Sequence, residues 1–238
     1  MEINTFERLL TEYSNTIDIK ISKKEIDLLY RYMNLLLDWN NKINLTAITK
    51  EEDIILKHFI DSISINEYLK EKNKIMDIGT GAGFPGIPLK IINPNMEFIL
   101  VDSLNKRINF LEEVAKELCL EKIQLIHSRV EDLAKNMNYR EKADVVVSRA
   151  VANLRVLVEY MLPFVKKEGI CICMKGPNIE EEIEEGKKAI EILGGKIEKI
   201  ENILLPGNLE RNLIIIKKIK NTPEKYPRKA GIPAKQPL

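Results

Sequence analysis

Cysteine and histidine are scarce in this sequence, which argues against a structural metal site. The 238 residues include 3 cysteines and 2 histidines. No two cysteines form a Cys-x-x-Cys pair, and only His58 and His127 could add nitrogen ligands, so we expect no zinc or other metal. Cys171 and Cys173 alternate within an apolar segment, which predicts buried thiols on one face of a strand.

Long apolar runs are also missing. No stretch approaches the roughly 20 apolar residues that a membrane-spanning helix needs, and charged residues make up 31% of the chain. The first ten residues place Glu2, Asn4, Glu7 and Arg8 among apolar side chains, unlike the apolar core of a secretory signal. We therefore expect a cytoplasmic protein without a membrane partner.

Neither sign of charge is in excess over the whole chain, but the charge is unevenly divided. The net charge is +1. From residue 217 onward, seven basic residues accompany one acid, a net charge of +6, so the remainder carries −5. A basic terminal segment on an acidic body favours a partner rich in phosphate, although a merely solvated tail would look the same.

The N-terminal part is predicted to be helical. Two capping-box patterns, Ser22 with Glu25 and Thr49 with Glu52, each precede apolar residues at helical spacing. The first of these helices is expected to end near Trp39, where a polar link begins.

From residue 74 onward, short apolar runs alternate with helical stretches, which is the pattern of βαβ units on a parallel sheet. Five such strands are followed by two more, joined by the turn Pro206-Gly207-Asn208 as a hairpin. The predicted strands are residues 75–78, 98–101, 123–126, 143–147, 170–174, 196–205 and 212–219.

This order of elements predicts an α/β protein with the Rossmann-like fold of S-adenosylmethionine-dependent methyltransferases. That fold has a mostly parallel central sheet with a C-terminal antiparallel hairpin, whereas a dinucleotide dehydrogenase would continue with parallel crossovers. We expect three segments: an N-terminal helical extension at 1–72, the methyltransferase domain at 73–220 and a basic, proline-rich tail at 221–238.

The strongest motif is KIMDIGTGAGFPG, residues 74–86. Gly79, Gly81 and Gly83 follow a strand at alternate positions, and a helix is expected to begin near Gly86. Glycine lets the backbone turn sharply and approach a ligand, and the N–H groups at the start of the next helix face that ligand. Because the same glycines satisfy G-x-G-x-x-G, a dinucleotide fits them as well as an adenosyl group does.

Acidic residues favour the methyl donor over a dinucleotide. Asp77 precedes the first glycine, where its carboxylate can receive the donor's ammonium group indirectly, and Asp102 ends the second strand, where it can bind both ribose hydroxyls. Val130 and Glu131 follow the third strand and place a backbone amide and a carboxylate at the expected adenine edge. Asp102 alone would suit NAD equally.

The fourth strand ends in Ser148-Arg149-Ala150. In the expected fold, the end of this strand normally faces the methyl group of the donor. The segment lacks the Asn/Asp-Pro-Pro-aromatic pattern of exocyclic-amine methylation and the Pro-Cys nucleophile that attacks a pyrimidine carbon. A ring nitrogen such as guanine N7 needs neither, so in-line positioning suffices. We assign no catalytic side chain and no general base; Arg149 is a candidate clamp for a carboxylate, a phosphate or the guanine oxygen.

Six motifs together make the sequence resemble, end to end, the bacterial ribosomal RNA methyltransferase family first called glucose-inhibited division protein B, or RsmG. They are WN and NLT within residues 39–46, HFIDS from 58, DIGTGAGFPGIPL from 77, VDSLNKR from 101, SRAVA from 148 and YPRKAGIPAKQPL from 226. Ile60 and Ile63 stand where relatives often have leucine, an apolar-for-apolar exchange. The resemblance implies methylation of N7 of one guanosine in small-subunit (16S) ribosomal RNA.

The resemblance also implies which residues bind each partner. The residues expected at the donor, and at its product S-adenosylhomocysteine, are Gly79, Phe84, Asp102, Ser103, Leu104, Val130, Glu131 and Arg149. The residues expected to face the RNA are Asn44, His58, Arg149, Tyr226, Arg228, Lys229 and Lys235.

Four prolines are expected to keep the tail extended, so that its cations and its tyrosine reach across the site to phosphates and a base. The expected partner is small-subunit ribosomal RNA or a ribosomal particle, and we expect a monomer. Two alternatives stay open: a dinucleotide-dependent oxidoreductase, and an RNA-binding module that catalyses nothing.

Overall fold

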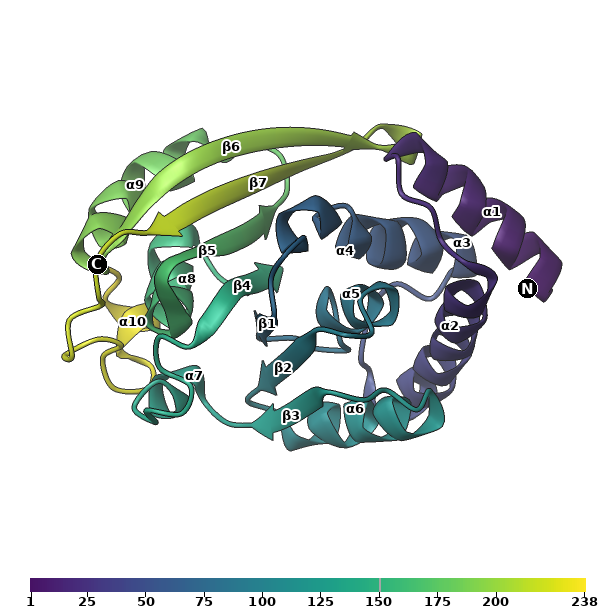
Figure 1. The fold of residues 1–238 in the computed structure, drawn as a ribbon, viewed down its shortest axis with the longest axis horizontal. Coiled ribbons are helices and arrows are strands. Elements are labelled where there is room, and N and C mark those ends of the chain that lie inside the picture. Colours follow the sequence, from purple (N-terminus) through teal and green to yellow (C-terminus); the bar gives the residue numbers. More distant parts are fainter. Residues whose placement is uncertain (150) are drawn as a thin grey trace.

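Residues 1–149 and 151–238, which the computed structural model describes, form a seven-stranded sheet with helices on both faces (Figure 1). The strand order is β3-β2-β1-β4-β5-β7-β6. The strands are β1 Lys74–Ile78, β2 Glu97–Asp102, β3 Ile123–His127, β4 Ala143–Arg149, β5 Val165–Lys175, β6 Gly195–Leu205 and β7 Leu209–Lys218. The first five pair in parallel, and β7 runs antiparallel to both β5 and β6.

The predicted fold class and all predicted strands are confirmed, with shifts at the strand ends. The largest shift is in β5, which begins at Val165 rather than at residue 170 because it includes the exposed run Lys166 to Glu168. The antiparallel β7 is the feature that the sequence hairpin predicted, and it departs from the parallel continuation expected of a dinucleotide dehydrogenase.

The helices cover the sheet as the amphipathic patterns indicate. They are α1 Ile3–Thr16, α2 Lys23–Ile43, α3 Glu51–Ile54, α4 Asp61–Ile63, α5 Gly86–Ile92, α6 Asn105–Glu117, α7 Val130–Leu133, α8 Leu154–Met161, α9 Glu180–Ile192 and α10 Ile232–Lys235. A π-helical stretch, Ile55–Ile60, joins α3 to α4. None of the helices in the described residues is long and apolar enough to cross a membrane.

One of the two predicted capping boxes is confirmed and the other is wrong. Ser22 and Glu25 exchange both capping hydrogen bonds at the start of α2. Helix α3 instead follows Lys50, without a side-chain cap, because the carboxylate of Glu52 accepts a hydrogen bond from the hydroxyl of Tyr13 at 2.9 Å rather than folding back on the chain. Helix α2 also continues to Ile43, beyond the expected end near Trp39.

Alternation along the strands sends successive side chains into two separate cores. Phe98 and Leu100 of β2 pack into the core beneath α2, α5 and α6, while Ile99 and Val101 pack into the core beneath α8 and α9. The predicted burial of both β5 cysteines is confirmed, since Cys171 and Cys173 are free thiols in the second core, 3.6 and 3.8 Å from the sulfur of Met161.

The N-terminal helices share the first core with the sheet. Phe6 of α1, Leu29 of α2 and Phe59 of the π-helical stretch are fully buried in the same cluster as Ile75 of β1. The division into segments at 72 and 220 stays a prediction. What the packing does establish is that α1 to α4 are positioned by hydrophobic contact with the domain that carries the glycine-rich turn.

Candidate functional site

A cavity of about 440 Å³ lies where β1, β2 and β4 end and where the chain leaves β3. In open α/β sheets, ligands bind outside the carboxyl ends of the strands, where the strand order reverses. Here the reversal falls between β1 and β4. The predicted site residues that line this cavity are His58, Gly79, Gly81, Phe84, Asp102, Ser103, Val130, Glu131 and Arg149.

The glycine-rich turn forms the floor of the cavity. The amides of Gly79 and Thr80 both donate to the carbonyl of Val101, at 2.9 and 3.1 Å, so the turn is fastened to the end of β2. Gly79 has a φ of +70°, and a Cβ there would lie 2.6 Å from Val151 Cγ2. Both the left-handed backbone and the crowding therefore exclude a side chain at this position.

Gly83 supports the turn from behind and does not itself line the cavity. Its φ is +100°, and a Cβ would lie 2.6 Å from Ile87 Cγ1 and 2.7 Å from the Tyr32 hydroxyl. That hydroxyl donates to the carbonyl of Ala82, so helix α2 holds the glycine-rich turn directly. No sequence pattern pointed to Tyr32, because its partner lies 50 residues away.

Asp77 is fully buried beneath the turn. Its Oδ2 accepts hydrogen bonds from the Thr80 hydroxyl at 2.6 Å and from the Gly86 amide at 2.9 Å, while its Oδ1 has no partner among the described residues. Burial raises the pKa of Asp77 to about 7, against the hydrogen bonds from Thr80 and Gly86, which lower it. A buried carboxylate oxygen without a donor suits a ligand that brings a positive charge nearby.

Asp102 stands at the end of β2 and is 3% exposed. Its Oδ2 accepts from the Gly81 amide and its Oδ1 from the Leu104 amide, both at 2.9 Å. Arg107 forms an ion pair with it at 3.1 Å and also lines the cavity. Leu104, predicted at the donor, contributes this amide, but its side chain is 43% exposed and does not line the cavity.

The opposite wall comes from α7 and α8. Val130 and Glu131 begin α7, and the Glu131 side chain is buried yet lines the cavity. Tyr160 of α8 joins them, a residue that no motif indicated because it belongs to an ordinary amphipathic helix.

His58, Phe84 and Arg149 form a stacked cluster on the side nearest β4. The ring of His58 stacks on Phe84 with 4.2 Å between centroids, and the Arg149 guanidinium lies 5.2 Å from the same ring. Arg149 Nη2 lies 3.0 Å from His58 Nδ1, and Thr46 Oγ1 lies 3.0 Å from His58 Nε2. Since arginine only donates, Nδ1 must accept, and the imidazole proton is on Nε2.

This environment keeps His58 neutral. Burial, assisted by the charge of Arg149, lowers the pKa of His58 to about 3. Both ring nitrogens are engaged in hydrogen bonds, so His58 is a packed, oriented component of the wall rather than a surface residue.

An unpredicted carboxylate holds this cluster in place. Asp61, 1% exposed, accepts from Arg149 Nη1 at 2.8 Å through Oδ2 and from Arg211 Nε at 3.0 Å through Oδ1. It therefore bridges β4 and β7 from the helical segment. Asp61 lies within the motif HFIDS, so the sequence offered a signal there, but its two arginine partners are distant in sequence. Ala150, in the motif SRAVA, lies outside the described residues.

The predicted RNA-facing residues are not gathered in one place. Asn44 is exposed at the end of α2 with a left-handed φ of 49°, while Tyr226 is 8% exposed and Arg228 pairs with the buried Glu159. Lys229 and Lys235 are exposed. The expected extended tail is wrong in part: the chain turns after Pro223 and forms α10, because its backbone is anchored at several points on the domain.

The chemistry of the cavity fits S-adenosylmethionine. The carboxylates of Asp102 and Glu131 line the cavity, and Asp77, with its unpartnered buried oxygen, lies beneath the glycine-rich turn without lining it. Such a set suits a ligand with an ammonium group, vicinal hydroxyls and an aromatic amine. The glycine-rich turn leaves room for its backbone to meet that ligand closely.

Comparison with known proteins gives consistent results. The chain matches the family model described as rRNA small subunit methyltransferase G over residues 25–214. It is 54% identical over 233 residues to the ribosomal RNA small subunit methyltransferase G of Clostridium tetani (strain Massachusetts / E88), covering 97% of this chain and 98% of that protein. It is 52% identical over 233 residues to the protein of the same name from Acetivibrio thermocellus, covering 97% and 96%.

Among solved structures, a SAM dependent methyltransferase from Aquifex aeolicus is similar, with a TM-score of 0.52 and 18% identity, covering 70% of this chain and 93% of that chain. At this identity the likeness concerns the fold alone.

Proposed function

The chain belongs to the rRNA small subunit methyltransferase G family, and from that premise we propose that it methylates N7 of a guanine in small-subunit ribosomal RNA. As a member of this family it is an S-adenosylmethionine-dependent methyltransferase that acts on small-subunit ribosomal RNA. We further propose that it works as a monomer in the cytoplasm.

The residues that would hold the donor are those of the cavity. When bound, S-adenosylmethionine supplies a methyl group on a positively charged sulfur. Among these lining residues, Asp102 would face the ribose hydroxyls, and Val130 with Glu131 the adenine edge. Asp77 does not line the cavity and would act on the ammonium group only indirectly, from beneath the glycine-rich turn. Arg107 forms an ion pair with Asp102. When the ribose binds to Asp102, Arg107 would either give up this ion pair or keep it beside the ribose.

The observation that supports this acceptor is that the cavity holds no histidine free to act as a base within the described residues. His58 is the only histidine that lines the cavity within the described residues, and its Nδ1 lone pair is already directed at Arg149. A side chain so placed cannot take a proton from an exocyclic amine. This supports a ring nitrogen with an in-plane lone pair, which requires no deprotonation.

The chain's contribution is then orientation of the acceptor. Arg149 is 14% exposed and spends its Nη1 and Nη2 on Asp61, Lys57 and His58, so it forms a rigid part of the wall. A base held against such a preorganised wall can be aligned with the methyl group, which is the main requirement for a displacement of this kind. We infer that RNA phosphates are met by exposed cations such as Lys229 and Lys235.

The two alternatives that the sequence left open lose their support. A dinucleotide-dependent oxidoreductase does not agree with the family or with the antiparallel β7, and a non-catalytic RNA-binding module does not agree with the family's activity.

The direct test uses S-adenosylmethionine with a labelled methyl group and small ribosomal subunits, or RNA from them, from cells that lack the enzyme. The labelled nucleoside is identified by mass spectrometry, and its position is mapped by chemical cleavage at N7-methylguanosine. We expect label on N7 of one guanosine. Label on an exocyclic amine, or on protein, would overturn the proposed acceptor. Running naked RNA beside intact subunits identifies which of them is the substrate.

A further inference from the structure

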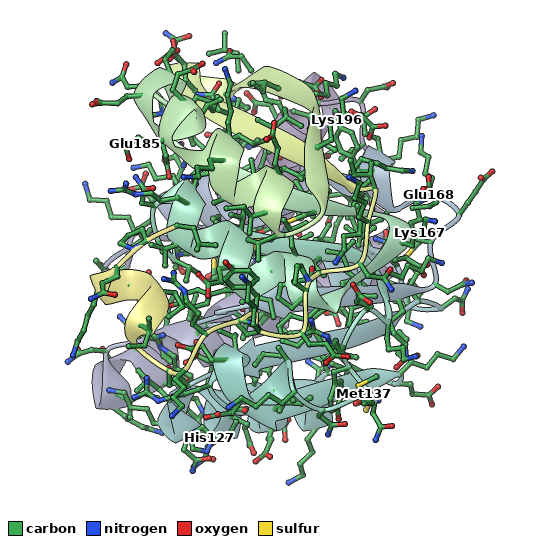
Figure 2. All side chains as sticks on the ribbon, turned by 90° about the vertical axis from the view of Figure 1, so that its left-hand side faces the viewer. His127, Met137, Lys167, Glu168, Glu185 and Lys196 are labelled. Carbon is green, nitrogen blue, oxygen red and sulfur yellow. The ribbon has the colours of Figure 1, made fainter. Side chains whose placement is uncertain are left out.

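The last 17 residues fold back on the domain and reach the wall of the donor cavity. We call residues 222–238 the C-terminal strap. After β7 the strap, the yellow segment in Figures 1 and 2, runs alongside the domain, meets α7 through Gly231 and packs α10 against α8. The strap therefore lies behind the same two helices that supply Glu131 and Tyr160 to the cavity.

Its entry is clamped by Arg140, which precedes β4. Arg140 Nη2 donates to the Thr222 carbonyl and Nη1 to the Tyr226 carbonyl, both at 2.9 Å. The Thr222 amide in turn donates to Glu141 at 2.7 Å. These bonds fix the backbone of the strap irrespective of its exposed side chains.

Its middle is fixed by a bidentate ion pair. Glu159 of α8 is fully buried, and Arg228 donates to it from Nε at 3.0 Å, from Nη2 at 2.6 Å and from its own backbone amide at 2.8 Å. A buried carboxylate needs such partners, because leaving it unpaired is costly. The residue after Glu159 is Tyr160, whose side chain lines the cavity.

Three residues further on, the strap touches a predicted ligand residue. The Gly231 amide donates to Glu131 Oε1 at 3.0 Å. Glu131 is 4% exposed and lines the cavity. With Oε1 engaged from behind, Oε2 is the oxygen that can accept a hydrogen bond from a ligand in the cavity.

We propose that Arg228 and Gly231 are positioning residues for the donor: through the Arg228–Glu159 pair and the Gly231 amide, the C-terminal strap orients the Glu131 carboxylate toward the 6-amino group of adenine. The inference rests on the proposed function for the identity of the ligand. A glutamate side chain turns about three bonds, and a fixed Oε1 removes most of that freedom before the ligand arrives.

An oriented carboxylate gives selectivity that loose packing does not. Adenine presents an N–H donor at position 6, whereas hypoxanthine presents a carbonyl oxygen, which a carboxylate repels. The wild-type chain should thus bind S-adenosylhomocysteine at least about tenfold more tightly than S-inosylhomocysteine, since a hydrogen bond to a charged group is worth roughly one order of magnitude or more in affinity.

The test measures the affinity of both compounds by calorimetry, on the full-length chain and without turnover. Arg228→Ala removes the ion pair, and Gly231→Pro removes the amide N–H and cannot adopt the φ of +81° found there. Gly231→Pro leaves Arg228 and Glu159 intact, so it serves if Arg228→Ala does not fold. Lys225→Ala is the matched control, an exposed strap cation that pairs with no carboxylate within the described residues. Circular dichroism establishes that each variant is folded.

The expected result is that a folded strap variant binds S-adenosylhomocysteine about tenfold more weakly, while its affinity for S-inosylhomocysteine changes less than about threefold. Lys225→Ala should retain both affinities. The inference is overturned if the ratio of the two affinities is unchanged in the folded strap variants, or if it changes equally in Lys225→Ala. The proposed function would stand in either case, because wild-type binding of S-adenosylhomocysteine still supports it. A wild-type chain that binds neither compound overturns both.

Discussion

At the scale of single residues, the site depends on charges and protons that are fixed by burial. Asp61 has almost no exposed surface, yet two arginines from different strands converge on its two oxygens. Removing one member of a buried ion pair leaves the other charges without compensation, which is more damaging than the loss of an exposed pair. Asp61 should consequently matter for stability and for the placement of Arg149.

We predict that Asp61→Asn lowers the free energy of unfolding by about 3 kcal/mol, because two partly buried guanidinium groups lose their counter-charge. The control is Asp53→Asn in α3, which removes the exposed pair between Lys57 and Asp53 and should cost less than about 1 kcal/mol. Urea titrations of both variants measure the difference. Equal losses in the two variants would show that the Asp61 bridge adds nothing.

The neutral state of His58 predicts a dependence of stability on pH. Its folded pKa of about 3 lies below the value of about 6.5 expected in the unfolded chain. Between these values only the unfolded chain binds the proton, so the stability contributed by neutral His58 is present above pH 6.5 and is lost as the pH falls toward 3.

From pH 7 to pH 5, wild type should lose about 2 kcal/mol more unfolding free energy than His58→Gln does. Asp77 has the opposite sign, since its raised pKa destabilises the folded chain as the pH rises from about 4 to about 7, but this contribution cancels in the comparison. A His58→Gln slope equal to that of wild type contradicts the assignment.

At the scale of elements, helix α2 is tied to the glycine-rich turn by one hydroxyl. Tyr32→Phe removes the donor to the buried Ala82 carbonyl, and we predict a loss of about 1–3 kcal/mol in stability together with several-fold weaker binding of S-adenosylhomocysteine. Tyr30→Phe on the same helix removes a hydroxyl that donates to the Met1 carbonyl at 2.9 Å, far from the turn. Tyr30→Phe should leave the affinity for S-adenosylhomocysteine unchanged. Similar affinities in the two variants would show that the Tyr32 hydroxyl does not support the donor site.

The elements also show what sequence patterns can predict. The strands were predictable because burial on both faces requires nearly continuous apolar runs, as in residues 98–101 and 143–147. The α2 cap was predictable because its bonds are local. The start of α3 was not, because Glu52 bonds to Tyr13, 39 residues away, and no local pattern contains that partner.

The site residues show the same difference between those that a local sequence pattern predicts and those that depend on tertiary contacts. The glycine turn, Asp102, Val130 and Glu131 follow directly after strands, so the topology alone brings them to one edge of the sheet. Asp61, Tyr32 and Tyr160 act from helices whose relation to the cavity is set by tertiary packing. The tail was predicted as an extended RNA-binding arm because proline and charge are visible in a sequence, whereas the buried glutamates that bind it are not.

At the scale of the whole molecule, the basic end of the chain has two kinds of cation. Arg228 forms an ion pair with the buried Glu159, while Lys229 and Lys235 are exposed on the strap. We predict that replacing these two lysines with alanine weakens RNA binding and lowers the slope of log affinity against log salt by up to about 2, because each phosphate contact releases roughly one counterion. Binding of S-adenosylhomocysteine should not change.

The matched control for this pair is Lys187→Ala with Lys188→Ala on α9, which removes the same charge from another part of the surface. Its salt slope should stay close to that of wild type. Filter binding of small-subunit RNA across a range of salt concentrations gives both slopes, and a slope that falls equally in the two double variants would mean that the strap has no special role in RNA binding.

Every functional assignment for this chain depends on binding of the donor by Asp102 in the cavity at the end of β2. Titration calorimetry with S-adenosylhomocysteine tests this most directly, on wild type, on Asp102→Ala and on Asp132→Ala, an exposed carboxylate of α7. We predict one binding site per chain, with affinity reduced at least about tenfold in Asp102→Ala and retained in Asp132→Ala. Folded wild-type protein that takes up no S-adenosylhomocysteine, or that binds it equally well without Asp102, would contradict the account.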